Sequence, residues 1–397
     1  MRESNSQQWF WRPLLYHLTN PLWVNKKIIA HLKRKFKIIN FNIIRLIGDD
    51  NMAKKRMRKK DRRFITICLF IIGLCLCGIG YYYLTNNEEV LDKIIPDIVE
   101  KKKLTIVDED SKKRPIAIMY DNNVGYNAHA GLQDSYLNYE VIVEGGLTRI
   151  MALFKDKDVS LIGPVRSSRH YFLDYALESD AIYCHYGWSE FAKNDISALG
   201  VNNINGLTDS KAYWRDNKIA APHNVFTNID TLYTQSKKYS YSVETSNWQV
   251  LNYDTEEVNL NTEDNTNNIV VNNVSLKYSN YHTTSYQYDS TNKYYLRLMD
   301  GIQHTDKTTG NQLHYKNIII MKVRNSTLDS YGRQDLDTVG TGEGYYVTNG
   351  YAIPIKWSKS SRKDKTKYLD DSGKEIKVND GNTFIQVIPI TTTIELS

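Results

Sequence analysis

The sequence predicts an α+β protein anchored in a membrane, with a mixed sheet and helices in an N-terminal domain and a mainly β C-terminal domain. Three observations lead to this fold class. Residues 64–84 form an apolar run without a charged side chain. Strand-like and helix-like runs alternate over residues 114–236, as in a sheet covered by helices. From residue 237 to 397, short Tyr-, Val- and Ile-rich runs are separated by Asn, Gly, Asp and Thr, which is typical of strands and turns.

The apolar run Phe64–Leu84 is long enough to cross a bilayer as a helix. Its 21 residues rise by about 1.5 Å each and cover the roughly 30 Å of a hydrocarbon core. Residues 53–63 carry eight Lys and Arg, whereas Glu88 and Glu89 follow the run. Because positive charge stays on the cytoplasmic side, we expect a single-pass cell-membrane protein with a cytoplasmic N-terminus and extracytoplasmic domains.

The cysteines favour this protein anchor over a lipid anchor. Cys68, Cys75 and Cys77 lie in the apolar run. Lipid attachment at Cys75 or Cys77 requires a small residue just before the cysteine, and leucine precedes both. We therefore expect an uncleaved transmembrane helix.

Residues 1–63 are predicted to form a basic cytoplasmic tail. Within it, residues 1–51 either lie on the inner leaflet as a basic amphipathic helix or precede the true start of the protein. The sequence Met52-Ala-Lys-Lys-Arg56 favours a mis-assigned start. Residues 1–84 hold 17 Lys and Arg against four acidic groups, which leaves 34 basic and 41 acidic groups in residues 85–397. The outer part is thus acidic, which argues against nucleic-acid binding.

A charged stretch, residues 85–113, is predicted to be a stalk that leads to the N-terminal domain, residues 114–236. In that domain Gly145-Gly146 is a two-residue hairpin signal between two strands. The expected strands are residues 114–121, 136–144, 147–155, 159–165 and 181–186, and the expected helices are residues 167–178 and 188–199. In the C-terminal domain, residues 237–397, the expected strands are residues 318–323, 344–348, 351–357, 376–378 and 383–388.

The run Gly163-Pro-Val-Arg166-Ser167-Ser168-Arg169 is the strongest candidate for a binding site. It lies where a strand passes into a predicted helix, and Ser167 or Ser168 is expected to cap that helix. Free backbone N–H groups and two guanidinium groups there would attract an anion, and Arg149 could reach the same place. The alternative is that these arginines pair with Asp121, Glu144 or Glu178.

Two carboxylates suggest a second kind of site. Asp121 and Glu144 each fall at the end of a predicted strand and could act as acid and base in glycan hydrolysis, assisted by His185 or His223. Acids at strand ends more often pair with arginines or fix loops. The histidines show no close pairing typical of a zinc motif, so we expect neither a metal nor a cofactor.

Eight motifs resemble the N- and C-terminal domains of the YerB-like family of bacterial envelope proteins. They are Arg114-Pro-Ile-Ala-Ile-Met-Tyr-Asp-Asn122, Glu144-Gly-Gly-Leu-Thr-Arg149, Gly163-Pro-Val-Arg-Ser-Ser-Arg169, Ala221-Pro-His-Asn224, Thr348-Asn-Gly350, Lys356-Trp357, Asp371-Ser-Gly373 and Asp380-Gly-Asn-Thr-Phe384. The resemblance covers roughly residues 113–390. It implies a lipoprotein-like envelope location and no specific activity, and this sequence departs from the family in its lipid-acceptor site.

Together these observations predict a non-catalytic envelope module. Its expected partners are the membrane and an anionic envelope polymer or an envelope protein, bound at Arg149, Arg166, Ser167, Ser168 and Arg169. The alternative is a cell-wall hydrolase that uses Asp121 and Glu144.

Overall fold

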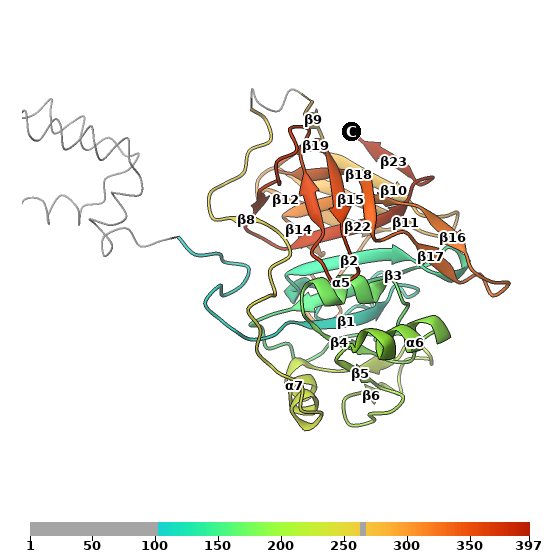
Figure 1. Ribbon diagram of the computed structural model, residues 1–397. Coiled ribbons are helices and arrows are strands. Elements are labelled where there is room, and N and C mark those ends of the chain that lie inside the picture. The colour runs from blue at the N-terminus through green and yellow to red at the C-terminus, as the bar shows by residue number, and fades with distance from the viewer. Residues whose placement is uncertain (1–101, 263–266) are drawn as a thin grey trace, which may run out of the picture. The chain divides into compact units, whose positions relative to one another are not determined.

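A large β-sheet runs through the protein and takes strands from both predicted domains (Figure 1). The structure is a computed structural model that describes residues 102–262 and 267–397. Residues 103–397 form one compact unit. The predicted tail, the transmembrane run Phe64–Leu84 and most of the stalk lie outside the described residues. In the described part, no helix is long and apolar enough to cross a membrane.

The N-terminal part combines seven strands with three α-helices and two short 3-10 helices. They are β1 (Ile116–Asp121), η1 (Leu132–Asp134), β2 (Leu137–Ile142), η2 (Glu144–Gly146), β3 (Thr148–Phe154), α5 (Phe172–Glu178), β4 (Ile182–His185), α6 (Glu190–Leu199), β5 (Asn203–Asn205), β6 (Trp214–Arg215), β7 (Val225–Phe226) and α7 (Ile229–Lys238). All elements after α7 in the described residues are strands, so the fold is α+β with more strand than helix.

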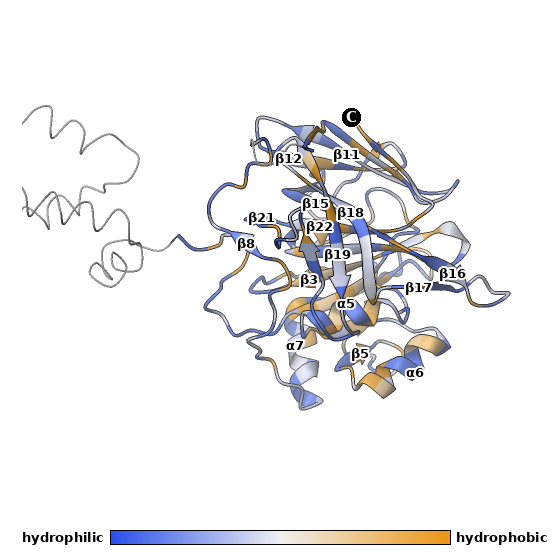
Figure 2. Cartoon of the chain, turned by 45° about the horizontal axis from the view of Figure 1, so that its top comes forward, coloured by the Kyte–Doolittle hydropathy of each residue, from blue (hydrophilic) through white to orange (hydrophobic). Residues whose placement is uncertain are grey.

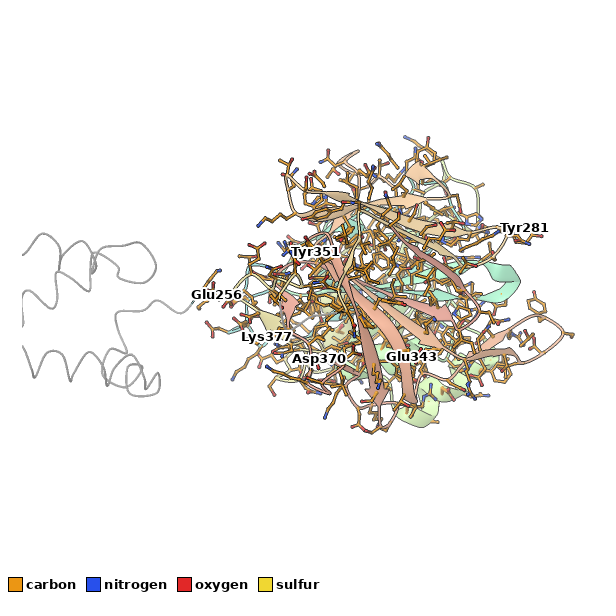
Figure 3. The ribbon with its side chains drawn as sticks, turned by 90° about the horizontal axis from the view of Figure 1, so that it is seen from above. Glu256, Tyr281, Glu343, Tyr351, Asp370 and Lys377 are labelled. Carbon is orange, nitrogen blue, oxygen red and sulfur yellow. The ribbon has the colours of Figure 1, made fainter. Side chains whose placement is uncertain are left out.

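Sixteen further strands follow. They are β8 (Tyr253–Asp254), β9 (Ile269–Val270), β10 (Asn273–Lys277), β11 (Thr283–Asp289), β12 (Tyr294–Met299), β13 (Ile302–Gln303), β14 (His314–Tyr315), β15 (Asn317–Val323), β16 (Asn325–Thr327), β17 (Gln334–Leu336), β18 (Gly340–Thr348), β19 (Tyr351–Lys359), β20 (Lys367–Leu369), β21 (Val378–Asn379), β22 (Thr383–Pro389) and β23 (Thr393–Leu396). Figure 3 labels Glu343 of β18 and Tyr351 of β19. These two strands pair with each other in the large sheet.

Strand β22 joins the two halves of the large sheet. The strand order is β20-β19-β18-β15-β22-β2-β3-β1-β4-β5, with β9 paired to β19. β22 runs parallel to β15 on one side and to β2 on the other. All seven of its residues are buried, as expected for a strand in the middle of a sheet covered on both faces. The N-terminal strands therefore complete their sheet with a strand from near the C-terminus.

Local sequence explains most helix ends. Ser189 caps α6 by accepting a hydrogen bond from the Ala192 N–H, and Gly200 ends it with a φ of 65°, in the left-handed region that glycine favours. The alternating apolar and polar positions of α6 are visible in Figure 2. Helix α5 begins at Phe172, five residues later than predicted. The preceding segment pairs with other backbone instead, since the Ser168 N–H donates to the Gly187 carbonyl.

A buried polar layer connects the large sheet to a second, six-stranded sheet with the order β13-β12-β11-β10-β23, to which β14 adds at β12. Glu140 of β2 and Arg297 of β12 are both fully buried, and their Oε2 and Nη2 atoms are 3.0 Å apart. Arg297 also donates to the Tyr286 hydroxyl, which accepts from the Gln386 amide of β22. The Arg297 guanidinium lies 4.6 Å from the Phe384 ring centroid. The two sheets are thus held together by charge and hydrogen bonds as well as apolar packing.

The change Glu140→Gln should strongly destabilise the fold, because it leaves the buried Arg297 charge without its counter-ion. We expect a loss of about 3–5 kcal/mol in the free energy of unfolding, the usual cost of breaking a buried pair, measured by urea denaturation. Glu140→Gln combined with Arg297→Met should recover much of that loss. Glu257→Gln, which breaks the exposed Lys293–Glu257 pair, is the control and should leave the urea midpoint unchanged. Equal shifts in the two single variants would contradict the assignment.

Candidate functional site

Three arginines converge where the loop after residue 162 runs beside β1 and β3. Arg149 of β3 is the register partner of Asp121 in β1. The Arg166 N–H donates to the Met119 carbonyl, which ties the loop to β1, and Arg149 Nη1 donates to the Ser167 carbonyl. Arg169 completes this group. We call Arg149, Arg166 and Arg169 the arginine cluster.

Asp121 holds one side of the cluster. Its carboxylate is 2% exposed, and Oδ2 lies 3.1 Å from Arg166 Nε. The same oxygen is 2.6 Å from Nδ1 of His223, a side chain that is 31% exposed. The structure therefore brings together Asp121, Arg166 and His223, three of the residues that the sequence suggested for two different kinds of site.

Glu144 holds the other side through a two-point contact with Arg169. Arg169 Nε and Nη2 lie 2.6 Å and 2.8 Å from the two carboxylate oxygens. Glu144 belongs to η2, the turn between β2 and β3, rather than to a strand. Burial alone would raise the pKa of Glu144, but the hydrogen bonds and charge of Arg169 lower it. Glu144 is thus held ionised, which suits an ion pair better than a general acid.

Arg149 is the least compensated member of the cluster. It is 7% exposed, and among the described residues its hydrogen-bond acceptor is the Ser167 carbonyl. Burial, followed by the charge of Arg169, lowers the pKa of Arg149 to about 10, with Glu144 opposing and Arg166 adding to the effect. A buried guanidinium has five N–H donors, so this group has unused capacity for a ligand.

The hydroxyl groups of Ser167 and Ser168 form hydrogen bonds within the protein, and each donates to a backbone carbonyl. The Ser167 hydroxyl donates to the Tyr186 carbonyl, and the Ser168 hydroxyl accepts from the Tyr183 hydroxyl and donates to the Arg169 carbonyl. Neither serine caps α5, whose N-cap position is Tyr171. The expectation of a helix N-terminus at the serines is therefore wrong, and any anion at the cluster would be bound by guanidinium groups.

His185 lies apart from these carboxylates. It is fully buried, its Nδ1 is 2.7 Å from the Gly187 carbonyl, and its Nε2 is 3.2 Å from Asn203 Oδ1. Burial lowers its pKa to about 4, so it stays neutral near pH 7. The neighbouring Cys184 is also buried, and burial raises its thiol pKa. These contacts fit a core histidine.

Sequence reasoning missed a histidine pair behind Asp121. Arg297 Nε donates to His304 Nδ1, and because arginine has no acceptor, His304 must carry its proton on Nε2. That proton points to His129 Nδ1 at 2.7 Å, and His129 Nε2 then donates to the Asp121 carbonyl at 2.7 Å. The chain of hydrogen bonds runs from the buried polar layer to Asp121. His129 and His304 are 175 positions apart, so no local motif in the sequence could have indicated that they form a pair.

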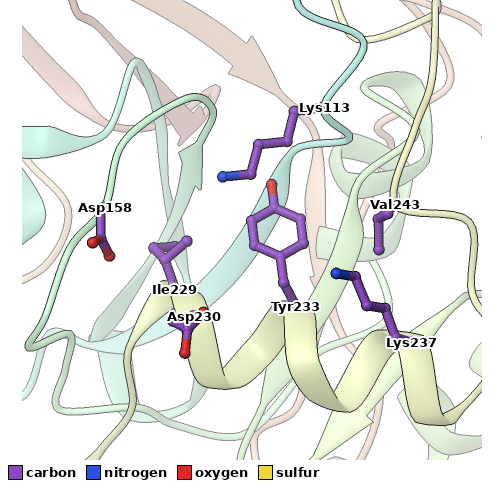
Figure 4. A pocket seen from close by; sticks show the side chains of 7 residues that line it. All are labelled: Lys113, Asp158, Ile229, Asp230, Tyr233, Lys237 and Val243. Carbon is purple, nitrogen blue, oxygen red and sulfur yellow. The ribbon is translucent and has the colours of Figure 1, made fainter.

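A separate cavity of about 340 Å³ beside α7 contains none of the predicted site residues (Figure 4). It is lined by Lys113, Asp158, Asp230, Tyr233 and Lys237 together with Ile229 and Val243. Lys113 Nζ lies 4.6 Å from the Tyr233 ring centroid. Its charges are balanced, with two lysines and two aspartates. In residues 102–262 and 267–397, no group of three or more His, Cys, Asp and Glu is arranged to hold a metal.

Comparison with known proteins gives consistent matches. Residues 104–242 match the N-terminal domain, and residues 273–385 the C-terminal domain, of the family described as "protein of unknown function (DUF3048)". The chain is 27% identical over 343 residues to "Putative lipoprotein YerB" of Bacillus subtilis (strain 168), covering 83% of this chain and 96% of that protein. The crystal structure of the YerB protein from Bacillus subtilis is similar with a TM-score of 0.63 and 28% identity, over 71% of this chain and 94% of that chain.

Stability should fall on both sides of about pH 6.5, the unperturbed pKa of histidine. Burial alone would lower the pKa of His282, but its hydrogen bonds with Asp300 and Glu140 raise it to about 9. The folded state therefore holds a proton that the unfolded state has lost between pH 6.5 and 9, and this stabilisation disappears as the pH rises through that window. Burial lowers the pKa of His129 to about 4, so stability also falls as the pH drops below 6.5. Urea midpoints measured from pH 4.5 to 9.5 test both slopes.

His282→Gln should flatten the alkaline slope, whereas the control His185→Gln, at a histidine that titrates on the acid side, should leave that slope intact. An unchanged alkaline slope in His282→Gln would show that another group titrates there.

Proposed function

Because the chain belongs to the bacterial family described as protein of unknown function DUF3048, whose relatives include YerB of Bacillus subtilis, we propose that it is a cell-envelope protein that binds an anionic ligand at the arginine cluster. The observation that carries the proposal is Arg149, a buried guanidinium whose hydrogen-bond acceptor, among the described residues, is the Ser167 carbonyl. A buried arginine normally pairs with an anion.

The charge balance of the site supports an anion. The cluster brings three guanidinium groups against the two carboxylates of Asp121 and Glu144, which leaves one positive charge. Residues 85–397 as a whole carry a net negative charge. An anion would therefore be attracted to this place rather than to the surface in general.

The shape of the donors narrows the ligand class. Guanidinium groups bind the oxygens of phosphate or carboxylate in two-point contacts. Arg169 uses both its Nε and Nη2 for Glu144, so Arg149 and Arg166 are the groups with donors to spare. An envelope polymer that carries repeated phosphate or carboxylate groups fits these donors, and the same chemistry would suit an acidic segment of an envelope protein.

A hydrolase is the second candidate. The observation that favours it is the 2.6 Å contact between His223 Nδ1 and Asp121 Oδ2, because an Asp that orients a half-exposed His is a common arrangement for a general base. The carboxylate pair itself is less suited to this chemistry, because Asp121 and Glu144 are each bound to an arginine.

Removing charge from the cluster should weaken anion binding. We expect the full-length protein to bind tripolyphosphate, measured by isothermal titration calorimetry at low salt, and Arg149→Met to weaken that binding at least about tenfold, since one charge-assisted contact contributes about 1.5–3 kcal/mol. Arg166→Gln should act similarly and Arg166→Lys less. Arg324→Gln removes one positive charge at an exposed position and is the matched control.

Binding that is equal in Arg149→Met, Arg166→Gln and Arg324→Gln would contradict the proposal, because it would reflect net charge alone. His223→Gln separates the two candidates. It should leave tripolyphosphate binding nearly intact, whereas a wall hydrolase would lose turnover of purified cell wall in that variant.

The proposed location has its own test. If residues 64–84 form an uncleaved anchor, the full-length protein should stay with the membrane after alkaline carbonate extraction, and a chain that begins at residue 85 should be released. Mass spectrometry should then find Cys75 and Cys77 without lipid. A lipid-modified N-terminal cysteine in the mature protein would overturn the transmembrane anchor and favour the lipoprotein type.

A further inference from the structure

A cavity of about 390 Å³ lies beside β5, the edge strand of the large sheet. It is lined by Trp188 and Thr208 together with residues of helix α6, of β5 and of the segment after α7. We call it the β5 groove. Its size is in the usual range for small-ligand sites. The arginine cluster does not line it, so an inference about it stands apart from the anion site.

Aromatic side chains form one wall of the groove. Trp188, Tyr239 and Tyr241 line it, and Tyr239 is 45% exposed. The rings of Tyr239 and Tyr241 are 5.6 Å apart with an angle of 32° between their planes. Their hydroxyl groups are fixed, because Tyr239 donates to Asp209 and Tyr241 donates to the Asn203 carbonyl. Tethered rings of this kind offer flat apolar area at low entropic cost.

A buried amide supplies a hydrogen-bond donor at the same place. Asn205 lines the groove and is 3% exposed. Its Oδ1 accepts from the Gly187 and Leu207 N–H groups at 3.0 Å and 3.1 Å, which fixes the orientation of the amide. Its Nδ2 then has no partner among the described residues. A buried donor without a partner indicates a missing oxygen from water or a ligand.

The edge strand is poorly suited to a peptide. A peptide that adds to a sheet needs free backbone carbonyls. Here the Asn203 carbonyl accepts from Tyr241, the Ile204 carbonyl accepts from the Tyr213 hydroxyl, and the Asn205 carbonyl accepts from the backbone at Thr208 and Asp209. Strand addition would have to break these bonds.

We propose that the β5 groove binds a neutral oligosaccharide built of pyranose rings. The apolar C–H face of a pyranose would pack on the aromatic wall, and a ring hydroxyl or acetamido oxygen would accept from Asn205 Nδ2. Ser197 and Thr208 add hydroxyl groups to the lining, and Lys193 is its one charged residue. This composition favours a neutral sugar over a polyanion.

The test uses full-length protein and two neutral probes, the β-1,4-linked trimer of N-acetylglucosamine and maltotriose, with binding measured by isothermal titration calorimetry. At least one probe should bind. Tyr239→Ala, at a half-exposed position, should weaken that binding at least tenfold. Asn205→Asp keeps the acceptor for Gly187 and Leu207 but removes the donor, and it should weaken binding similarly with the fold retained by circular dichroism.

Tyr331→Ala is the matched control, because Tyr331 is a 78% exposed tyrosine away from the groove. It should bind as the native protein does. The proposal is overturned if neither sugar binds at millimolar concentration, or if Tyr239→Ala binds as tightly as Tyr331→Ala. Loss of tripolyphosphate binding in Arg149→Met with sugar binding retained would show that the two sites are separate.

Discussion

The pairing of Glu140 with Arg297 is the constraint on which the rest of the fold depends. Both charges are fully buried between the two sheets, where neither would be tolerated alone. Each of the sheets contributes one partner, so the sheets must meet in one register for both charges to be neutralised. Apolar packing alone would allow neighbouring registers at modest cost, whereas a misplaced charge would not.

The same pair reaches the candidate site through fixed protons. Arg297 determines the tautomer of His304, His304 that of His129, and His129 donates to the carbonyl of Asp121. The hydrogen bond from His129 thus positions the Asp121 backbone, while the Asp121 carboxylate faces Arg166 and His223. A change in the polar layer would therefore affect the arginine cluster, although no residue of the layer belongs to the cluster.

Much of the fold followed from local patterns. The strand at Ile318 and the one at Thr383 are continuous apolar runs, and both are buried sheet strands. The three strands β10, β11 and β12 were not among the predicted strands, because they lack the continuous Val and Ile runs on which the predictions in this half relied. The pairing of β2 with β22 could not be predicted either, since the two strands lie about 245 residues apart in the sequence. Pairing at that distance leaves no trace in one sequence.

Local sequence located the candidate site better than it explained it. Arg166 and Arg169 lie in a motif that drew attention through its charges, and Arg149 was expected to join them. The error lay in the backbone, because a helix was predicted to start at Ser167 and that segment instead bridges to residues 187–188. Glu140 could not be recognised as buried, since the alternation Leu137-Asn-Tyr-Glu-Val141 predicts a solvent-facing side for Asn138 and Glu140, whereas all six positions of β2 are buried.

The position of β22 also determines when the protein can finish folding. A ribosome makes β1 to β5 first, and the edge of β2 then has no partner until residues 383–389 emerge. For most of synthesis this edge exposes unpaired backbone groups, which other chains could join. Completion of the large sheet is therefore a late event, and a chain cut short before Thr383 would leave an open sheet rather than a smaller domain.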